Sequence, residues 1–416
     1  MGKCFSDEVE LALKYIYYDL RAGKGEEGLT LLKAASDAGD GDASCILARC
    51  YCGSQYVWSG HDFPEDDDKA VALLRKSIDQ GSAVGVLVAM RTGELTQDME
   101  RHMPFSSLEE VFDCVLKKAQ TGDAFCQYTV GNTYFWWDFL RIQGKDRSSF
   151  STQKEFKEYL RENISKCEDW FQKAFRGGMY FAANNLNRYY TQGDEDIILP
   201  RPEKAVDLWK TGAEMGYPIH QYIYADNLKK EGKMEDALYW YKLAVEGGQL
   251  ECWYCIGEAY ENGTGVPEDI SYAVQCYEKG LTQRKDTSKK VACANALGAL
   301  CYEGKKMPKD YDRAFRLLKY GLDHGSDFGV CYLGKCYFRG WGTQQDYGKA
   351  RELLEKVTWT NKEAFYMLGA IYGQGLGVPA DIKKGVGYLL KAGDNIEAKE
   401  ELLKYKKTLF GKWVRR

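Results

Sequence analysis

The chain has 416 residues, which exceeds one ordinary domain of ~100–200 residues, so several domains or a repeat array are expected. Hydrophobic residues make up 44%, enough for a large core, which argues against global disorder. The 57 basic and 61 acidic side chains give a net charge of −4, which argues against a broad nucleic-acid-binding surface. The longest uncharged apolar runs are far shorter than the ~18–20 residues of a membrane helix.

The N-terminal sequence MGKCFSDEVELALKY lacks the apolar stretch of a signal peptide, because acidic residues interrupt it from Asp7 onward. A cytoplasmic location is therefore expected, with the 14 cysteines acting as reduced, buried thiols. Met1-Gly2-x-x-x-Ser6 also matches the myristoylation pattern, and Cys4 could be palmitoylated beside it. With these modifications the protein would be a lipid-anchored scaffold, and without them the terminus would be frayed and unmodified. Stable membrane insertion is expected in neither case.

A helical signature then recurs along the whole chain. A small residue opens the pattern at Ala12, Ala43, Ala83, Cys126, Ala182, Cys252, Cys293, Gly329 and Ala364, with His220 as the one break in the column. A second column of mostly small residues lies at Gly28, Ala70, Val111, Cys167, Ala205, Ala237, Ala273, Ala314, Ala350 and Gly385. Small residues at matched positions let two antiparallel helices approach closely, while larger neighbours fill the core. The two columns predict ten helix pairs.

Helix-end residues support this interpretation. Asp269, Asp310, Asp346 and Asp381 are placed to cap the second helices of four pairs. Gly39, Gly81, Gly122, Gly216 and Gly325 are placed as left-handed C-caps. The predicted fold is an all-α, right-handed superhelical solenoid of about ten helix-turn-helix repeats, closed by a helix from about 396 to 409. If each repeat contacts only its neighbours, truncation from one end should lower the stability gradually.

Insertions interrupt repeats two to four. They comprise residues 53–68, residues 93–107 and residues 136–165, and the second part of the last one has a helical pattern. In a solenoid such insertions generally map to one face, which is often the functional face. The alternative is neutral variation in surface loops.

The repeat resembles the Sel-one-like repeat (SLR) family, which is related to the tetratricopeptide repeat. Leu/Ile-Gly-x-x-Tyr occurs at Ile256–Tyr260, Leu333–Tyr337 and Leu368–Tyr372, and Gly-x-Gly-Val-Pro-x-Asp occurs at Gly263–Asp269 and Gly375–Asp381. The match is regular over 180–393 (repeats five to ten) and degraded over 1–179 (repeats one to four), and 394–416 would form the capping helix and a basic tail. The resemblance implies an adaptor or scaffold with a concave surface, built as one continuous solenoid.

In the tetratricopeptide relatives the first helix of each pair lines the concave groove, which implies a set of partner-binding positions here. One such position directly follows the glycine slot of the repeat, and it is occupied by Asn132 in repeat four and by Arg49 in repeat two. The candidate groove residues are Tyr128, Asn132, Phe135, Trp136, Asn184, Arg188, Tyr222, Asp226, Tyr254, Glu258, Asn295, Lys335, Arg339 and Tyr366. Asn can bond a peptide backbone and Tyr supplies rigid contact area, so these types suit a protein or peptide partner. Some of the tyrosines could instead pack between neighbouring first helices.

Signs of catalytic chemistry are weak. The four histidines (His61, His102, His220 and His324) form no zinc or triad motif, and the Cys252-x-x-Cys255 pair falls on a core column. The Gly-x-Gly loops join two helices and lack the Lys-Ser/Thr ending of phosphate loops. We therefore expect no metal, no cofactor and no catalytic residue. The aromatic and basic tail LFGKWVRR (409–416) could bind an acidic surface or a membrane, or pack as an ordinary terminus.

The sequence thus predicts a non-enzymatic adaptor that binds a protein or peptide along its groove, with the 136–165 insertion as a second contact. An inhibitor or immunity protein of one enzyme is a specific version of this function. The alternative from another class is a small-molecule-binding or hydrolytic SLR protein related to cell-wall or β-lactam chemistry. That alternative needs polar residues that converge in one pocket.

Overall fold

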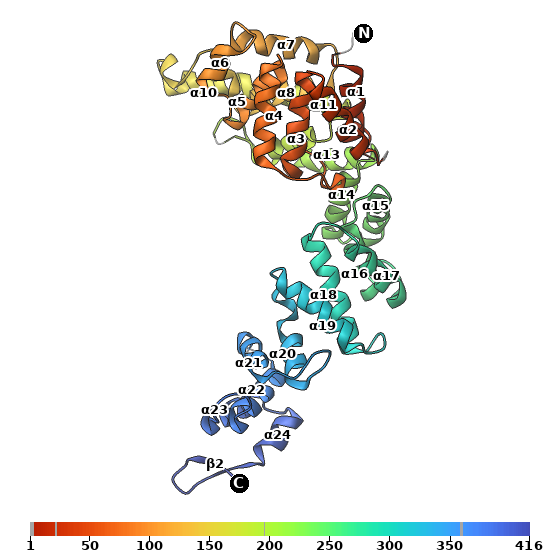
Figure 1. The fold of residues 1–416 in the computed structure, drawn as a ribbon, viewed down its shortest axis with the longest axis vertical. Helices are drawn as coiled ribbons and strands as arrows, with labels where there is room; N and C mark the ends of the chain where they lie inside the picture. Colours follow the sequence, from red (N-terminus) through yellow and green to blue (C-terminus); the bar gives the residue numbers. More distant parts are fainter. Residues whose placement is uncertain (1–3, 21–22, 195, 358–360) are drawn as a thin grey trace. The chain divides into compact units, whose positions relative to one another are not determined.

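The computed structural model describes residues 4–20, 23–194, 196–357 and 361–416, and it has the predicted all-α architecture (Figure 1). The described residues form paired helices, and a short C-terminal hairpin supplies the two strands of the one sheet among them. The contacts group the chain into two compact units, residues 1–249 and residues 250–416. The boundary predicted at 179/180 does not coincide with this division, and helices α11 (Lys166–Arg176) and α12 (Ala182–Thr191) pack together across it.

Unit 1 contains most of the irregular elements. Its elements are α1 (Asp7–Leu13), η1 (Lys14–Tyr18), α2 (Gly25–Asp37), α3 (Gly41–Tyr51), η3 (Gly53–Gln55), η4 (Ser59–His61), α4 (Asp67–Asp79), α5 (Ala83–Thr92), α6 (Gln97–His102), α7 (Leu108–Gln120), α8 (Ala124–Phe135), α9 (Asp138–Ile142), η5 (Arg147–Ser149), α10 (Gln153–Ile164), α11 (Lys166–Arg176), α12 (Ala182–Thr191), α13 (Glu203–Glu214), α14 (Pro218–Lys230) and α15 (Met234–Glu246).

Unit 2 is a regular series of helix pairs. Its elements are α16 (Cys252–Asn262), α17 (Ile270–Leu281), α18 (Ser288–Glu303), α19 (Tyr311–Asp323), η6 (Asp327–Gly329), α20 (Val330–Arg339), α21 (Tyr347–Lys356), α22 (Lys362–Gln374), α23 (Ile382–Lys391), α24 (Ile396–Leu402), β1 (Tyr405–Lys407) and β2 (Trp413–Arg415).

Paired helices approach each other closely at the glycines of the Leu/Ile-Gly-x-x-Tyr motif. A Cβ atom added at Gly257 of α16 would lie 2.6 Å from the ring of Tyr277 in α17. At Gly334 the nearest atoms would be those of Leu354, at 2.8 Å. Real Cβ contacts are longer than this, so only glycine lets the second helix pack at this distance.

The predicted caps are also confirmed. Asp269, Asp310, Asp346 and Asp381 each accept a hydrogen bond of 2.9 Å from the backbone N–H three residues further on. The predicted C-cap glycines lie in the left-handed region, with φ between 83° and 106°. The cysteines are free thiols, and most of them are buried in helix contacts. Local rules therefore fix most helix ends.

In unit 1, some repeats contact repeats that are not their neighbours in the chain. Tyr17, in the first repeat, is fully buried, and its ring centroid lies 5.8 Å from that of Phe125 and 6.1 Å from that of Phe181. Phe5 also packs against Phe125, at 6.3 Å. The first repeat thus packs onto the fourth and fifth, and the prediction of neighbour-only contacts is wrong for this unit. The reason is a large apolar surface on the first repeat, which the distant rings bury.

The insertion at 53–68 is anchored in the core of unit 1 by several side chains, while residues 64–68 are exposed. Val57, Trp58 and Phe63 are buried, and the Trp58 indole Nε1 donates to Gln249 Oε1 at 3.0 Å. The Tyr56 carbonyl accepts a hydrogen bond of 3.1 Å from the Tyr17 hydroxyl. The insertion therefore joins the first repeat to the far end of unit 1.

The insertion at 136–165 is partly helical, as predicted, and comprises α9, η5 and α10. Its apolar side chains pack on one another, with 5.2 Å between the ring centroids of Phe150 and Phe156, and Leu160 and Ile164 continue into the core. This segment extends the surface of unit 1 without interrupting the helix pairs on either side.

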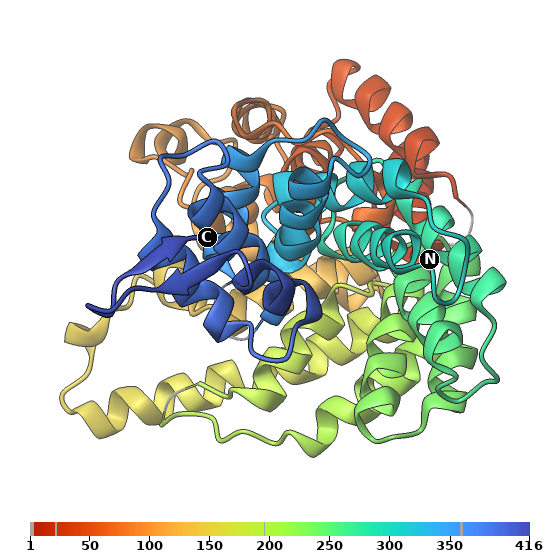
Figure 2. The ribbon, with the colours of Figure 1, turned by 90° about the horizontal axis from the view of Figure 1, so that it is seen from below.

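The C-terminal helix is shorter than predicted. It ends at Leu402, and residues 405–407 pair with 413–415 as an antiparallel hairpin that contacts α23 (Figure 2). Tyr405 is buried and donates to Glu401 at 3.3 Å, which leads the chain out of the helix. The turn between the strands carries Leu409 and Phe410, both fully exposed.

Candidate functional site

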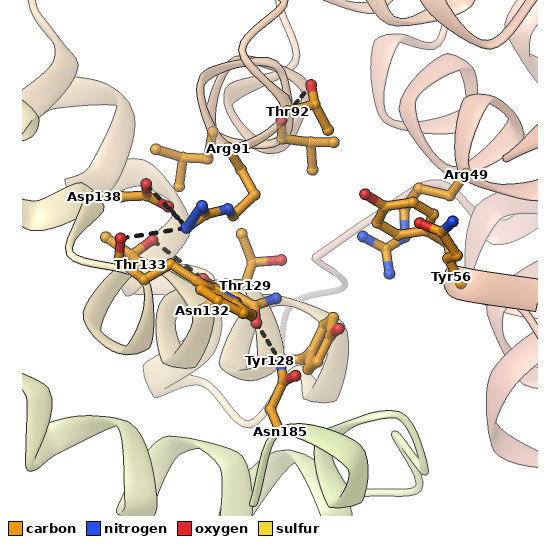
Figure 3. Close-up of a pocket in the computed structure, with 14 residues that line it drawn as sticks. Arg49, Tyr56, Arg91, Thr92, Tyr128, Thr129, Asn132, Thr133, Asp138 and Asn185 are labelled. Atoms are coloured by element: carbon orange, nitrogen blue, oxygen red, sulfur yellow. Dashed lines mark hydrogen bonds and ion pairs between the residues drawn. The ribbon is translucent and has the colours of Figure 1, made fainter. Parts of the chain in front are cut away.

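A cavity of about 330 Å³ opens among the first helices of unit 1 (Figure 3). Helices α3, α5, α8 and α12 provide its walls, and Gln55 and Tyr56 of the 53–68 insertion close one side. Its lining residues are Arg49, Gln55, Tyr56, Leu87, Val88, Arg91, Thr92, Tyr128, Thr129, Asn132, Thr133, Trp136, Asp138 and Asn185. We call this space the Arg49 cavity. Its lining carries two arginines and one carboxylate.

Arg49 is the most unusual residue of the cavity. It is only 6% exposed, and its Nε donates to the Tyr17 hydroxyl at 3.3 Å. The guanidinium carbon lies 5.0 Å from the Tyr56 ring centroid, 5.4 Å from that of Phe125 and 5.6 Å from that of Tyr128. Among the described residues, its Nη2 has no hydrogen-bond partner and its guanidinium forms no ion pair. Aromatic rings, rather than a carboxylate, surround this buried cation.

Arg91 stands on the opposite side of the cavity and, unlike Arg49, is paired with a carboxylate (Figure 3). Its Nη1 donates to both Asp138 carboxylate oxygens at 3.2 Å and to the Trp136 carbonyl at 3.4 Å. Burial raises the pKa of Asp138 to about 6, and Arg91 and Arg141 oppose that rise. The pair is therefore mostly ionised at neutral pH, and Asp138 neutralises Arg91.

The backbone between α8 and α9 is strained where it forms this pair. Trp137 adopts a φ of 67°, in the left-handed region that non-glycine residues rarely occupy. Its indole Nε1 donates to Asp194 at 2.8 Å, and the side chain is partly buried against the core. The sharp turn brings the Trp136 carbonyl and the Asp138 carboxylate to the same guanidinium.

A ring and two amides complete the lining. The Trp136 ring centroid lies 4.9 Å from the guanidinium carbon of Arg91 and 4.6 Å from that of Arg188. Asn185 donates to Asn132 Oδ1 at 2.6 Å, which ties α12 to α8 and leaves the Asn132 amide nitrogen to donate to a ligand (Figure 3). The cavity thus combines cations, hydrogen-bond donors and aromatic faces.

A second hollow of about 420 Å³ adjoins the cavity and shares Arg49, Gln55, Tyr56, Val88 and Thr92 with it. Its acidic residues, Asp67 and Glu94, make this side negative, whereas the Arg49 cavity has a positive excess. Arg49 and Tyr56 lie where the two hollows meet.

The structure brings together three of the groove residues predicted in unit 1, since Tyr128, Asn132 and Trp136 line the cavity. Asn184 and Arg188 of α12 are exposed, and the guanidinium of Arg188 reaches Trp136.

Three other predicted residues of unit 1 lie elsewhere. Phe135 is buried in the core, 5.9 Å from Phe171 between ring centroids, because helical spacing turns it toward the second helix. Tyr222 packs against Tyr241, and Asp226 accepts a hydrogen bond from the Tyr241 hydroxyl within the α14–α15 pair. Intra-pair contacts thus occupy these two positions.

The predicted residues of unit 2 mostly bond to neighbours. The Tyr254 hydroxyl donates to Glu258 at 2.9 Å, and Asn295 is buried with its amide nitrogen 2.8 Å from the Ser326 hydroxyl. Lys335 pairs with Glu363, Arg339 pairs with Glu397, and Tyr366 lies half-buried 6.0 Å from the guanidinium carbon of Arg339. In this unit the predicted groove side chains are bonded either within their own helix or to residues of the following repeat.

Sequence reasoning missed Arg91, Asp138, Asn185 and Tyr56. Asn185 is the neighbour of a predicted residue, so a shift of one position in the degraded repeat would have included it. Tyr56 and Asp138 belong to insertions, whose placement depends on contacts distant in sequence. The position of Asn132 in repeat four is that of Arg49 in repeat two, but no local pattern shows that a cation lacks a counter-ion.

The histidines and cysteines form no reactive cluster in the described part of the chain. His220 is fully buried between aromatic rings, and burial lowers its pKa to about 3. Burial raises the pKa of Cys293 and of Cys336 to about 12. Across residues 4–20, 23–194, 196–357 and 361–416, no group of three or more His, Cys, Asp or Glu side chains could hold a metal ion.

The predicted lipid sites fall partly outside the described residues. Gly2 lies in the segment that the structure leaves undescribed. Cys4 is half-buried, with its Sγ atom 3.1 Å from the Thr121 hydroxyl oxygen. None of the described helices has the length and apolarity needed to cross a membrane.

Comparison with known proteins places these helix pairs in one family. The Sel1 repeat matches residues 43–82, 158–179, 177–217, 229–249, 254–283, 291–326, 329–356 and 363–395, which together cover more than half of the chain. The chain is 28% identical over 257 residues to chitin synthase regulatory factor 3 of Schizosaccharomyces pombe; the match covers 50% of this chain and 26% of that protein. The chain thus spans about a quarter of the length of this relative.

Two solved structures are similar in fold. A protective antigen of uropathogenic Escherichia coli strains, with an SLR fold, is 21% identical with a TM-score of 0.49, covering 94% of this chain and 78% of that one. A Sel1 repeat protein from Oxalobacter formigenes is 20% identical with a TM-score of 0.45, covering 91% and 96%. With eight matched segments and the helix pairing seen here, the chain belongs to the Sel1 repeat family.

Proposed function

We propose that this protein is a non-enzymatic scaffold that binds a protein or peptide partner on the first helices of unit 1. Sel1 repeat proteins generally act as protein-interaction scaffolds, and the relative from S. pombe is named as a regulatory factor. The observation that carries the proposal is the Arg49 cavity, which four first helices line with aromatic, amide and cationic side chains. Arg188 and Asn184 continue this surface outside the cavity.

The proposed partner is a protein or peptide rather than a nucleic acid, and the proposed location is the cytoplasm. The Arg49 cavity holds an extended segment better than a flat surface would, because its donors lie on facing walls. In unit 2 two of the predicted groove cations already form ion pairs, Lys335 with Glu363 and Arg339 with Glu397. A partner that binds there must break ion pairs, so unit 1 is the preferred site.

The alternative of a small-molecule site is favoured by one observation. A cavity of about 330 Å³ reaches the lower limit of ligand pockets, which is ~300 Å³. Hydrolysis has less support. Among the described residues, neither a histidine nor a cysteine lines the Arg49 cavity. The hydroxyls of Thr129 and Thr133 donate to backbone carbonyls of their own helix.

The proposal is tested by panning a phage-displayed library of random 12-residue peptides against the full-length chain. We expect enriched peptides that lose at least tenfold in affinity for the Trp136→Ala/Arg188→Ala variant. The same peptides should bind the matched Tyr254→Ala/Tyr366→Ala variant of unit 2 like the wild type. Absence of any enriched sequence would count against a peptide-binding scaffold, and loss of affinity only in the second variant would move the site to unit 2.

A further inference from the structure

Arg49 stands out among the buried charges of unit 1, because nothing in the described structure neutralises it. Lys118, by comparison, is paired with Asp42 at 2.9 Å, and Arg91 is paired with Asp138. A buried cation without an opposite charge is costly, since the aromatic rings around it replace only part of its hydration. The fold keeps this cation at the wall of a cavity rather than in solvent.

The unpartnered donor belongs to a side chain that lines the cavity. The Arg49 side chain is anchored through its Nε–H bond to Tyr17, so the guanidinium is held in place. Its Nη2 lacks a partner among the described residues, and Figure 3 shows the guanidinium on the opposite side of the cavity from the Arg91–Asp138 pair. Guanidinium N–H groups match the oxygens of carboxylates and phosphates.

The rest of the lining fits the same ligand. The charges of Arg49, Arg91 and Asp138 sum to a single positive charge, and the Asn132 amide can donate beside them. Tyr128 and Trp136 offer flat apolar surface for the carbon atoms that carry the charged group. The lining is thus complementary to one negative group attached to an organic chain.

We infer that the Arg49 cavity binds an oxyanion, a carboxylate or a phosphate, carried by a side chain of the bound peptide, with Arg49 as its counter-ion. That the anion belongs to a peptide rests on the proposed function. That the cavity takes an anion rests on the geometry around Arg49. Asp138 is a positioning residue, because it pairs with Arg91 and neutralises its charge, so that Arg91 attracts the ligand less strongly.

The first test uses inorganic phosphate as the probe. Thermal unfolding of the full chain is measured in sodium phosphate and in sodium chloride at equal ionic strength. We expect phosphate to raise the Tm of the wild type and of Arg101→Met, which removes an exposed arginine of the same unit. In Arg49→Met the rise should be smaller than in these two proteins, because only the general stabilising effect of phosphate remains. Its Tm in chloride should equal or exceed that of the wild type. A large fall of the Tm in chloride would instead show a structural role.

The second test uses the panned peptides. An acidic residue should recur at one position in them. Replacing that residue by Gln should weaken binding to the wild type at least tenfold, phosphoserine should be accepted there, and Arg49→Met should bind both forms alike. Asp138→Asn, which frees Arg91, should increase the preference for the charged form.

The outcomes separate the two proposals. Panned peptides that bind Arg49→Met like the wild type would overturn the oxyanion inference and leave the scaffold intact. A phosphate effect that depends on Arg49, with no peptide enriched, would leave an oxyanion site for a small molecule and overturn its assignment to a peptide. No phosphate effect, together with no preference for charged peptides, would remove the inference altogether.

Discussion

Arg49 and His220 are buried titratable side chains that the core of unit 1 holds in opposite charge states. Arg49 remains a cation at any pH at which the protein folds, because a guanidinium does not lose its proton in this range. His220 remains neutral, because Phe175, Trp209 and Tyr217 surround it and both its ring nitrogens lack hydrogen-bond partners among the described residues. The histidine that interrupts the column of small residues is thus an apolar packing element.

This state predicts an acid-sensitive stability. The pKa of His220 is about 3 in the folded chain, against about 6.5 when unfolded. Between these values the unfolded chain binds one more proton at this position, so stability falls as the pH drops from 6.5 toward 3, by about 1.4 kcal/mol per pH unit. Urea unfolding at pH 7 and pH 5 should show a smaller loss for His220→Leu than for the wild type. His102→Gln, at an exposed site, is the control, and an equal loss in all three proteins would refute this role.

At the scale of helix pairs, the glycines of the repeat set how closely two helices pack. Gly257 is in contact with Tyr277, whereas a Cβ at Gly387 of α23 would meet no atom within 4 Å. The two residues therefore provide a matched test inside unit 2, since both lie in helices and only one has a neighbour.

The two alanine substitutions should have opposite effects. Gly257→Ala forces the Tyr277 ring aside, and overpacking costs about 1–3 kcal/mol, which exceeds the helix gain of about 1 kcal/mol. Gly387→Ala obtains the helix gain alone and should stabilise by about 1 kcal/mol. Denaturant unfolding of unit 2, followed by circular dichroism, measures both changes. Equal stabilisation by the two alanines would contradict the close-approach argument.

The helix pairs could be predicted from the sequence because their determinants are local. A capping aspartate and a small column residue act within one repeat, and Asp310 and Gly385 behave as their positions predicted. The end of α24 could not be predicted, since Tyr405 leaves the helix to bond Glu401 and pack beneath a hairpin. The charged residues after 402 fit an exposed helix face equally well.

At the scale of each unit, the contacts of unit 1 join residues far apart in the chain. Trp58 bonds Gln249, and Tyr17 packs against Phe125 and Phe181, so the first repeat and the 53–68 insertion are parts of a common core. No repeat pattern shows such contacts, which is why the sequence predicted independent neighbours. The same limit applies to the site. The repeat pattern predicted Tyr128 and Asn132, but it could not predict that the 53–68 insertion closes one side of the cavity.

A single substitution tests this coupling. Tyr17→Ala removes a fully buried ring and should destabilise unit 1 by about 3–5 kcal/mol. Because the ring contacts the fourth and fifth repeats, amide hydrogen exchange should accelerate in α8 and at 179–181 as well as in the first repeat. Tyr277→Ala, at a buried tyrosine of unit 2, should affect α16 to α18 and leave unit 1 unchanged. Acceleration confined to residues 4–37 after Tyr17→Ala would restore the neighbour-only description.

The most direct test of the central claim is calorimetric titration of the full-length chain with the best panned peptide and with its Gln-substituted form. With the wild type, the acidic peptide should bind at least tenfold more tightly than the amide form, and in Arg49→Met the two should bind alike. A tenfold preference that persists in Arg49→Met, or no preference in the wild type, would contradict the assignment of Arg49 as the counter-ion of a bound partner.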